Sequence, residues 1–215
     1  MESTPEKLEL ITKYFADFTD EQLQQLAALE GAYKDWNAKI NVISRKDIDQ
    51  LYIRHVLHSL SIATICNFED GAQIIDIGTG GGFPGIPLAI FFPNVEFLLV
   101  DSIGKKITVV QEIAQAIGLK NVTAIHSRAE QIKNRTFDFA VSRAVAPLLD
   151  LWTWAAPLLK KGHASDTLAN GLICLKGGDL TDEIAASKLR PHYWDLHTIF
   201  PEPLFQDKCI LYVKK

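Results

Sequence analysis

Apolar and polar positions divide the chain into a helical N-terminal part and a longer part in which strands and helices alternate. Over residues 1–66, apolar residues recur at the spacing that places them on one face of a helix. From Gln73 onward, short apolar runs alternate with amphipathic segments, which is typical of helices packed on a mostly parallel sheet. We therefore predict an N-terminal helical extension over 1–66 and an α/β domain over 67–215, with helices on both faces of its sheet.

Three helices are expected in the extension. The first is predicted by the apolar spacing of residues 8–18. Thr19 followed by Gln22 fits a capping box, which predicts the start of a second helix whose apolar stripe ends at Trp36. The third is expected to bury Ile53, Val56, Leu57 and Leu60 and to group Arg54, His58 and Ser61 on its other side.

Seven strands are expected in the second part, near 73–77, 95–100, 122–126, 137–142, 170–175, 192–199 and 208–214. Helices are expected between them, near 86–91, 103–117, 148–160 and 180–188. The last two strands have no helix between them, so we expect them to pair as a hairpin through the Phe200–Pro203 turn. The polar stretch 160–170 contains Gly162 and predicts a mobile loop.

A glycine-dense segment follows the first predicted strand and runs Asp76-Ile77-Gly78-Thr79-Gly80-Gly81-Gly82-Phe83-Pro84-Gly85. Glycine lets the backbone turn sharply and approach a ligand with no Cβ in between. The helix that follows presents free N–H groups at its start. Strand, turn and helix together are typical of a nucleotide-binding βαβ unit. A tight turn without a ligand is the alternative, but it leaves five glycines in eight residues without a purpose.

Two carboxylates beside this turn limit the choice of ligand. Asp76 precedes the first glycine and would repel the pyrophosphate of a dinucleotide, whereas it suits S-adenosylmethionine, which carries an ammonium and a sulfonium group. Asp101 ends the second predicted strand, where a carboxylate can accept both hydroxyls of a ribose. Asp101 therefore indicates an adenosine but does not choose between the two ligands.

Three further segments follow strands at the edge of the sheet where open α/β sheets bind ligands. The segment Ser127–Glu130 could cover an adenine or form a solvated loop. Arg143 lies where a methyltransferase sheet faces the reacting methyl group; it could clamp phosphate or guanine, or pair with a carboxylate at the edge of the core. Lys176 could contact phosphate or a base, or extend into solvent.

Composition excludes several classes of protein. A chain of 215 residues with 47% hydrophobic residues can build one domain with a modest extension. No apolar run reaches membrane-spanning length and the N-terminus is not signal-like, so we expect a cytoplasmic protein without membrane contact. The three cysteines form no C-x-x-C pair, which predicts reduced thiols and no metal site. The net charge of −4 argues against broad nucleic-acid affinity but permits a local basic face.

The extension offers the candidates for such a face. They are Lys39, Arg45, Lys46, Arg54, His55 and His58, with Trp36 and Tyr52 between them. Asp35, Asp47 and Asp49 dilute this charge, so a solvated charged surface is the simpler interpretation for any single residue. His55 and His58 lack a third ligand at suitable spacing and are not expected to bind a metal.

These motifs resemble the bacterial small-subunit ribosomal RNA guanine-N7 methyltransferases, a family also called glucose-inhibited division protein B. The likeness spans nearly the whole chain, and Gly80–Pro87 is its most specific segment. The other matching stretches are Trp36-Asn37 with Asn41, Arg54-His55, Asp76–Thr79, Asp101-Ser102 with Gly104–Lys106, Ser127–Glu130, Ser142–Ala144 and Leu175–Gly177.

The resemblance implies a class I, Rossmann-like methyltransferase fold with a seven-stranded, mostly parallel sheet. It implies an enzyme that uses S-adenosylmethionine to methylate N7 of one guanine in the 530 loop of 16S ribosomal RNA, within the 30S subunit. The cofactor-binding residues that it implies are Gly78, Phe83, Asp101, Ala129, Glu130 and Arg143. A monomer is expected.

Guanine N7 has a free lone pair and can attack a methyl group without first losing a proton, so no general base is expected. An arginine, which cannot act as a base near neutral pH, agrees with this. We expect Arg143 and Lys176 to act in catalysis by position and charge, with Lys176 holding RNA. The target base should be looped out, because the A-form major groove hides N7.

Two features depart from the family's usual pattern. His58 stands where aspartate is usual, which would make the exposed face of the third helix more basic, and the loop 162–170 looks longer than usual. Three other functions share part of the pattern: a nicotinamide dehydrogenase, a methyltransferase for small molecules or proteins, and a ribosome-assembly factor without turnover. Asp76 disfavours the first, the second has no use for an RNA-binding face, and the third would bind RNA without reaction.

Overall fold

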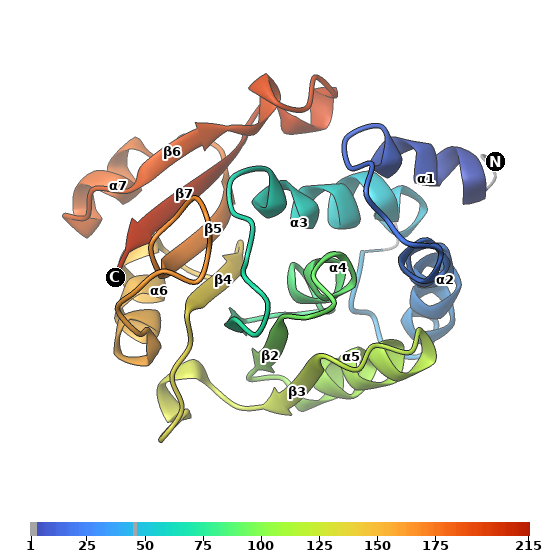
Figure 1. Cartoon of the computed structure of the whole chain (residues 1–215), viewed down its shortest axis with the longest axis horizontal. Coiled ribbons are helices and arrows are strands. Elements are labelled where there is room, and N and C mark those ends of the chain that lie inside the picture. The colour runs from blue at the N-terminus through green and yellow to red at the C-terminus, as the bar shows by residue number, and fades with distance from the viewer. Residues whose placement is uncertain (1–3, 45–46) are drawn as a thin grey trace.

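The computed structural model describes residues 4–44 and 47–215 and contains a seven-stranded sheet in the order β3-β2-β1-β4-β5-β7-β6 (Figure 1). The strands are β1 (Gln73–Ile77), β2 (Glu96–Asp101), β3 (Val122–His126), β4 (Phe139–Arg143), β5 (Gly171–Gly177), β6 (His192–Asp195) and β7 (Lys208–Lys214). Strands β1 to β5 pair in parallel, whereas β7 is antiparallel to both β5 and β6. The predicted mostly parallel sheet and its terminal hairpin are therefore confirmed.

Helices cover both faces of this sheet, as predicted. The α-helices are α1 (Thr4–Thr12), α2 (Asp20–Asn37), α3 (His58–Leu60), α4 (Gly85–Phe91), α5 (Gly104–Ala116), α6 (Leu148–Ala155) and α7 (Thr181–Ser187). The shorter turns are η1 (Ile48–Gln50), the π-helical η2 (Tyr52–Leu57), η3 (Ser61–Thr64), η4 (Ala129–Gln131), η5 (Ala156–Leu158), η6 (Leu196–Thr198) and η7 (Pro203–Phe205).

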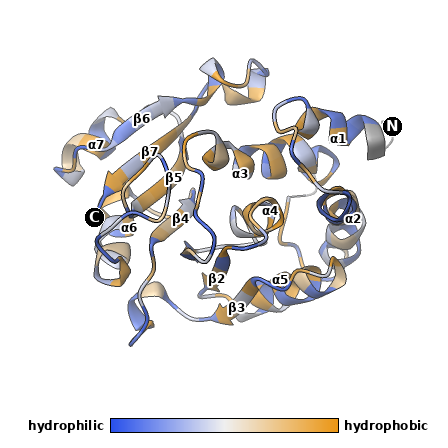
Figure 2. Cartoon of the chain, in the orientation of Figure 1, coloured by the Kyte–Doolittle hydropathy of each residue, from blue (hydrophilic) through white to orange (hydrophobic). Residues whose placement is uncertain are grey.

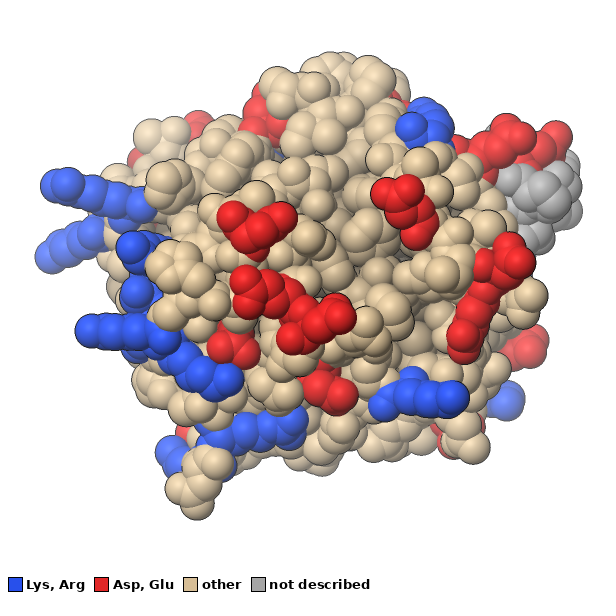
Figure 3. All heavy atoms as spheres, in the orientation of Figure 1, with Lys and Arg blue, Asp and Glu red and all other residues tan. Residues whose placement is uncertain are grey.

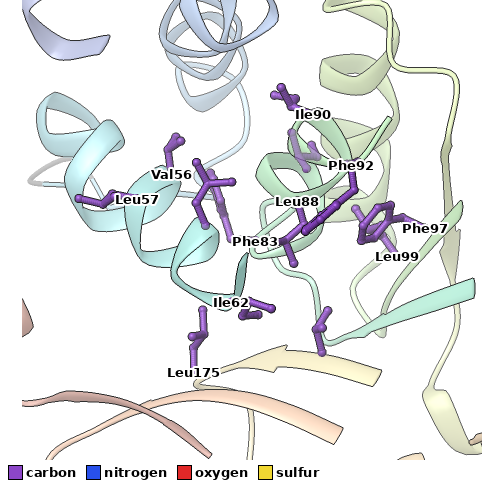
Figure 4. Close-up of a cluster of buried hydrophobic side chains, with 14 of the residues drawn as sticks. Val56, Leu57, Ile62, Phe83, Leu88, Ile90, Phe92, Phe97, Leu99 and Leu175 are labelled. Carbon is purple, nitrogen blue, oxygen red and sulfur yellow. The ribbon is translucent and has the colours of Figure 1, made fainter. Parts of the chain in front are cut away.

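Strand residues alternate between two apolar cores, because successive side chains point to opposite faces. Ile74 belongs to the core that contains α1 to α5, and Ile75 belongs to the core under α6. Hydropathy follows this arrangement: β5 and β7 are strongly apolar, and the edge strand β6 is mostly hydrophilic (Figure 2). Figure 4 shows part of the first core, to which Val56 and Leu57 of the extension and Leu88 of α4 all belong.

The N-terminal extension packs directly on the sheet domain. The Gln22 side chain donates hydrogen bonds to the carbonyls of Ile90 (2.8 Å) and Phe91 (3.1 Å) at the end of α4. The same Gln22 completes the predicted capping box with Thr19 at the start of α2. These contacts place the start of α2 against the end of α4, while the division at residue 66 stays a prediction.

The first predicted helix ends earlier than its apolar spacing suggests. Helix α1 ends at Thr12, and Phe15 and Phe18 lie in the following segment. Both rings meet Phe91 edge-on, with ring centroids 5.3 and 5.5 Å apart. Their spacing reflects burial against α4, so the expected helix over 8–18 is wrong beyond Thr12.

The third predicted helix is distorted, and its expected polar side is wrong. A π-helical segment, η2, precedes α3, and the wider turn changes which residues share a face. Arg54 is exposed as expected, but His58 is 8% exposed and Ser61 is fully buried. The His58 ring lies edge-on to Phe205 of η7, with centroids 6.0 Å apart. His58 therefore does not make an exposed face more basic, because tertiary packing covers it. Two other candidates for the basic face, Arg45 and Lys46, lie outside the described residues.

The remaining differences concern element ends. Strand β6 ends at Asp195, whose side chain accepts a hydrogen bond from the His197 N–H (2.9 Å) and starts η6. The predicted helix 148–160 is α-helical only to Ala155 and continues as η5. The predicted loop near 160–170 is irregular, and Ser165 forms an isolated bridge with Phe68.

Charges are mixed on the face shown in Figure 3. Acidic side chains gather in its middle, and basic side chains follow its left edge, on the side of β6 and α7 in Figure 1. Among the described residues, no helix is long and apolar enough to cross a membrane. Within the same ranges, no group of three or more His, Cys, Asp or Glu side chains is placed to hold a metal ion.

Candidate functional site

Two adjoining cavities lie at the carboxyl ends of β1, β2, β3 and β4. The glycine-loop cavity has a volume of about 410 Å³ and is lined by Val42, His55, Gly78–Gly81, Phe83, Asp101–Ile103, Lys106 and Arg143–Val145. The Ala129 cavity has a volume of about 250 Å³ and is lined by Ile77, Gly78, Val100–Ser102, Ser127–Glu130, Val145 and Trp154. Gly78, Asp101, Ser102 and Val145 line both. The two volumes therefore form one divided cleft at the edge of the sheet where ligands are expected.

The glycine turn after β1 needs glycine for its shape and for its close contacts. Gly78, Gly80 and Gly82 have φ angles of +69°, +59° and +98°, a region that residues with a Cβ rarely adopt. A Cβ on Gly78 would lie 2.6 Å from a methyl group of Val145, the residue that stands between the two cavities. The turn therefore brings backbone, without side chains, to the wall of the cleft.

Asp76 braces this turn from beneath. Its Oδ2 accepts hydrogen bonds from the Thr79 hydroxyl (2.6 Å) and from the Gly85 N–H (2.9 Å), while its buried Oδ1 has no partner within residues 4–44 and 47–215. Complete burial raises the pKa of Asp76 to about 7. Asp76 is not among the residues that line either cavity, so it acts on the cleft through the shape of the turn and through its charge.

Phe83 lines the glycine-loop cavity, and its ring lies between another aromatic ring and a cation. Its ring stacks on Tyr33 of α2, with centroids 5.0 Å apart, and the Arg143 guanidinium lies 5.0 Å from its centroid. The Tyr33 hydroxyl also donates a 2.6 Å hydrogen bond to the Gly81 carbonyl. Helix α2 thus fixes the glycine turn, a role for the extension that sequence reasoning missed.

Arg143, at the end of β4, is held by neutral groups. Its guanidinium donates to the Arg54 carbonyl (3.1 Å) and to Nδ1 of His55 (2.8 Å). Among the described residues it forms no ion pair with a carboxylate, which excludes the alternative of a simple core-edge pair within that part of the chain. Burial lowers the pKa of Arg143 to about 10, so the guanidinium stays charged at neutral pH. Arg143 also lines the glycine-loop cavity.

His55 is the neutral partner of that arginine. Burial and the Arg143 charge lower the pKa of His55 to about 3. Because a guanidinium can only donate, Nδ1 of His55 accepts, and the ring proton must be on Nε2. That Nε2 is buried and finds no hydrogen-bond partner in the described part of the chain. His55 therefore orients Arg143 and carries no charge of its own near neutral pH.

Asp101 stands at the junction of the two cavities. Its Oδ2 accepts from the Gly80 N–H (2.9 Å) and its Oδ1 accepts from the Ile103 N–H (2.8 Å). Each carboxylate oxygen can accept more than one hydrogen bond, so both remain able to bind a pair of hydroxyl groups. The position at the end of β2 agrees with the expectation from the sequence.

The segment after β3 lines the Ala129 cavity and is not simply a solvated loop. Ala129 is buried at the start of η4, and Glu130 is exposed beside it. The structure thus groups all six expected cofactor-binding residues around the cleft. Phe83 and Arg143 line the glycine-loop cavity, Ala129 and Glu130 line the other, and Gly78 and Asp101 line both.

Lys176 is placed differently from what its position at the end of β5 suggested. Its side chain is 7% exposed, pairs with Glu183 of α7 (2.7 Å) and donates to the Ala146 carbonyl (2.6 Å). The same Glu183 carboxylate accepts from the Leu148 N–H (2.8 Å). Lys176 lines neither cavity; it holds the segment that connects Arg143 to α6, and its expected contact with RNA stays a prediction.

Several residues of the cleft carried no signal in the sequence. Val145 is 41% exposed and separates the cavities, and Ile103 and Trp154 complete their walls. Single apolar residues in loops follow no period, so hydropathy patterns could not distinguish them from surface residues. The position of Val145, two residues after the strand-end arginine, was the only available indication.

Comparison with known proteins gives consistent results. A family model described as rRNA small subunit methyltransferase G (GidB) matches residues 22–196. A curated protein of Bacteroides fragilis named Ribosomal RNA small subunit methyltransferase G is 55% identical and covers 96% of this chain and 99% of its own length. Proteins with the same name from Phocaeicola vulgatus (56% identical; 96% and 98% covered) and Porphyromonas gingivalis (50%; 98% and 95%) are also similar.

Solved structures agree on the fold. A crystal structure of MtNAS in complex with S-adenosylmethionine matches with a TM-score of 0.60 at 14% identity, covering 97% of this chain and 83% of that one. A SAM-dependent methyltransferase from Aquifex aeolicus matches with a TM-score of 0.55 at 13% identity, covering 86% and 97%. These matches, together with the strand order, confirm the predicted class I, Rossmann-like methyltransferase fold.

Proposed function

The chain belongs to the rRNA small subunit methyltransferase G family of enzymes, and from this membership we propose that it methylates N7 of one guanine in the 530 loop of 16S ribosomal RNA. The donor is S-adenosylmethionine and the substrate is the 30S subunit in the cytoplasm. One observation supports this most directly: all six residues expected to bind the donor line one cleft in a chain that matches its relatives over nearly full length.

The residues of the cleft fit S-adenosylmethionine. Asp101 lies at the junction, where a ribose between two compartments would place its hydroxyls. Ala129 and Glu130 offer a buried apolar surface and a carboxylate for adenine, and Phe83 and Arg143 offer a ring and a cation for the amino-acid end. When bound, the donor supplies a methyl group on a sulfonium, which is open to direct nucleophilic attack.

The protein's part in the reaction is to position and to stabilise charge. The nucleophile is a lone pair that carries no proton, so no side chain has to accept one. Arg143 is charged and His55 is neutral at neutral pH, so neither is a base of useful strength for the attack. Arg143 is fixed by two hydrogen bonds and by Phe83, which lowers the entropic cost of alignment.

Lys176 has a positioning role in this proposal. Its contacts with Glu183 and with the Ala146 carbonyl hold the turn that carries Arg143 and Val145. Ala144 in that turn has a φ of +52°, an uncommon backbone conformation that needs support from its surroundings. The Lys176–Glu183 pair supplies this support from outside the cleft.

The proposal is tested by labelled methyl transfer to 30S subunits that lack the modification, followed by mapping of the labelled base. We expect label at one guanine, and no incorporation into 30S subunits that are already modified. Transfer to small molecules or proteins without ribosomal particles would favour a different methyltransferase. Tight binding to 30S subunits without any transfer would favour an assembly factor, and either result would contradict the proposal.

A further inference from the structure

A third cavity opens beside the glycine-loop cavity. It has a volume of about 380 Å³ and is termed the His58 cavity; its lining residues are Asp47, Arg54, His55, His58, Arg143, Ala144, Leu204 and Lys208. It shares His55, Arg143 and Ala144 with the glycine-loop cavity. Arg143 alone belongs both to the six residues assigned to the donor and to this cavity, which leaves room here for the second reactant.

One residue that lines this cavity has a buried polar atom with an unused hydrogen-bonding capacity. His58 is 8% exposed, and its buried Nε2 has no hydrogen-bond partner among the residues that the structure describes. A buried polar group without a partner costs free energy, so its presence in a cavity wall indicates a ligand that completes the bond. Burial also keeps the pKa of His58 well below its ordinary value, so the ring is neutral and offers one donor and one acceptor nitrogen.

The cavity combines a neutral interior with positive charge. Leu204 of η7 supplies an apolar wall, and Phe205 lies against the His58 ring at 6.0 Å between centroids. Lys208, at the start of β7, forms no ion pair with any carboxylate of the part of the chain described here. Arg54 is exposed and pairs with Asp47 at 3.4 Å. An uncharged flat ring could pack beside Leu204 and His58 inside the cavity, and a phosphate could pair with Lys208.

We propose that the His58 cavity receives the target base of the RNA, with His58 hydrogen-bonding the base and Lys208 contacting a flanking phosphate. This inference rests on the proposed function. The base must leave its helix to expose N7, and a cavity that shares a wall with the donor's cavity provides the place for it. Ala144 contributes only a methyl group to that shared wall.

The reaction balances without a further reactant. The N7 lone pair forms the new N–C bond while the C–S bond breaks, and the sulfonium becomes a neutral thioether. The positive charge moves to the purine ring, and no proton is transferred. Neutral imidazoles at His55 and His58 add no repulsion to this product charge, whereas a protonated histidine at either position would.

Two variants test the pocket. His58→Leu removes the ring nitrogen and keeps an apolar side chain, and Lys208→Gln removes the charge from a partly exposed position. We expect His58→Leu to lower kcat/KM for 30S subunits about tenfold, the factor for about 1.4 kcal/mol or one hydrogen bond. We expect Lys208→Gln to raise KM for 30S subunits about threefold to tenfold with nearly unchanged kcat. Lys161→Gln, an exposed lysine in the loop before β5, is the matched control.

Calorimetry with S-adenosylmethionine separates the possible results. Unchanged donor affinity in both variants, with the losses above, supports the pocket. Wild-type kinetics in both variants, in a protein that methylates 30S subunits, overturns the pocket and leaves the proposed function intact. Parallel loss of donor affinity also overturns it, because the cavity would then belong to the donor site. If the wild-type protein transfers no methyl group to 30S subunits, the proposed function fails first. Lys208→Gln decides the matter if His58→Leu does not fold.

Discussion

Arg143 and Lys176 are alike in the sequence and opposite in the structure. Each is a cation at the end of a buried parallel strand, and the two strands are neighbours in register, with Arg143 opposite Leu175. Arg143 bonds a carbonyl and a neutral imidazole and faces the glycine-loop cavity. Lys176 pairs with Glu183 and lines neither cavity of the cleft. A cation at the end of a strand is thus a functional candidate only when no carboxylate of the folded protein pairs with it.

The physical reason lies in what each cation can still do for a ligand. A guanidinium held by neutral acceptors keeps its full charge available for an anionic group of a ligand in the cleft. An ammonium that is paired with a carboxylate attracts a distant anion only weakly, because the two charges nearly cancel. The ion pair instead holds the loop in place. Substitutions of these two cations and of the residues around them test this difference.

Arg143→Ala should have the largest effect on catalysis. We expect methyl transfer to 30S subunits to fall about a hundredfold or more, because a positioned charge and a clamp are lost together. Arg143→Lys should recover little, since an ammonium cannot bond two acceptors in a fixed plane. Initial rates of label incorporation measure the effect, with circular dichroism as the check on folding. Full activity of Arg143→Ala would remove this residue from the mechanism.

Lys176→Met should mainly reduce stability. The pair with Glu183 is neither fully buried nor at the surface, with side-chain exposures of 7% and 25%, so we expect a loss of about 2 kcal/mol in the free energy of unfolding. The double variant Lys176→Met, Glu183→Gln should recover most of this loss, because the introduced amide leaves no unpaired charge and its oxygen can still accept from the Leu148 N–H. Urea denaturation measures both, with Lys161→Gln as the exposed control. Unchanged stability of Lys176→Met together with a hundredfold loss of methyl transfer would instead mean that Lys176 acts directly in the reaction, as we propose for Arg143.

Asp76→Asn should change the pH dependence of stability. The pKa of Asp76 is raised from 3.8 to about 7, so the folded protein holds a proton that the unfolded chain releases between these values. Its contribution therefore makes the wild type less stable as the pH rises from 4 to 7, by up to about 1.4 kcal/mol per pH unit. Asparagine can still accept from Thr79 and Gly85 but does not titrate. Comparing unfolding of the two proteins at pH 5 and pH 8 measures the difference; parallel curves would show that Asp76 is not so perturbed.

His55→Gln should have the smallest effect. Glutamine keeps an acceptor for the Arg143 guanidinium, so we expect transfer rates within about fivefold of wild type, the loss of less than one hydrogen bond. The pKa of His55 is about 3, so its titration does not occur between pH 6 and 8. The pH–rate profiles of the two proteins should therefore superimpose over that range. A step near pH 6.5 in the wild type alone would mean that His55 is charged during the reaction.

Parts of the fold were predictable because local spacing and tertiary packing agreed. The strands over 73–77, 122–126 and 208–214 coincide with β1, β3 and β7, and the capping box at Thr19 marks the start of α2. Prediction failed where packing overrode spacing. Phe18 continues an apolar period but lies beyond α1, and His58 occupies a polar face that η2 and η7 bury.

The sequence alone predicts the glycine turn, the order of strands and helices along the chain, and six of the residues that line the cleft. These depend on local conformation, since φ angles at Gly78 and Gly82 and the ends of parallel strands follow from residue type and period. Three properties were known only from the tertiary structure. They are the strand-end cation that has no carboxylate partner, the contact of Tyr33 in α2 with the glycine turn, and the cavity lined by His58. Those properties depend on partners far along the chain, and burial and pairing between distant residues leave no period in the sequence.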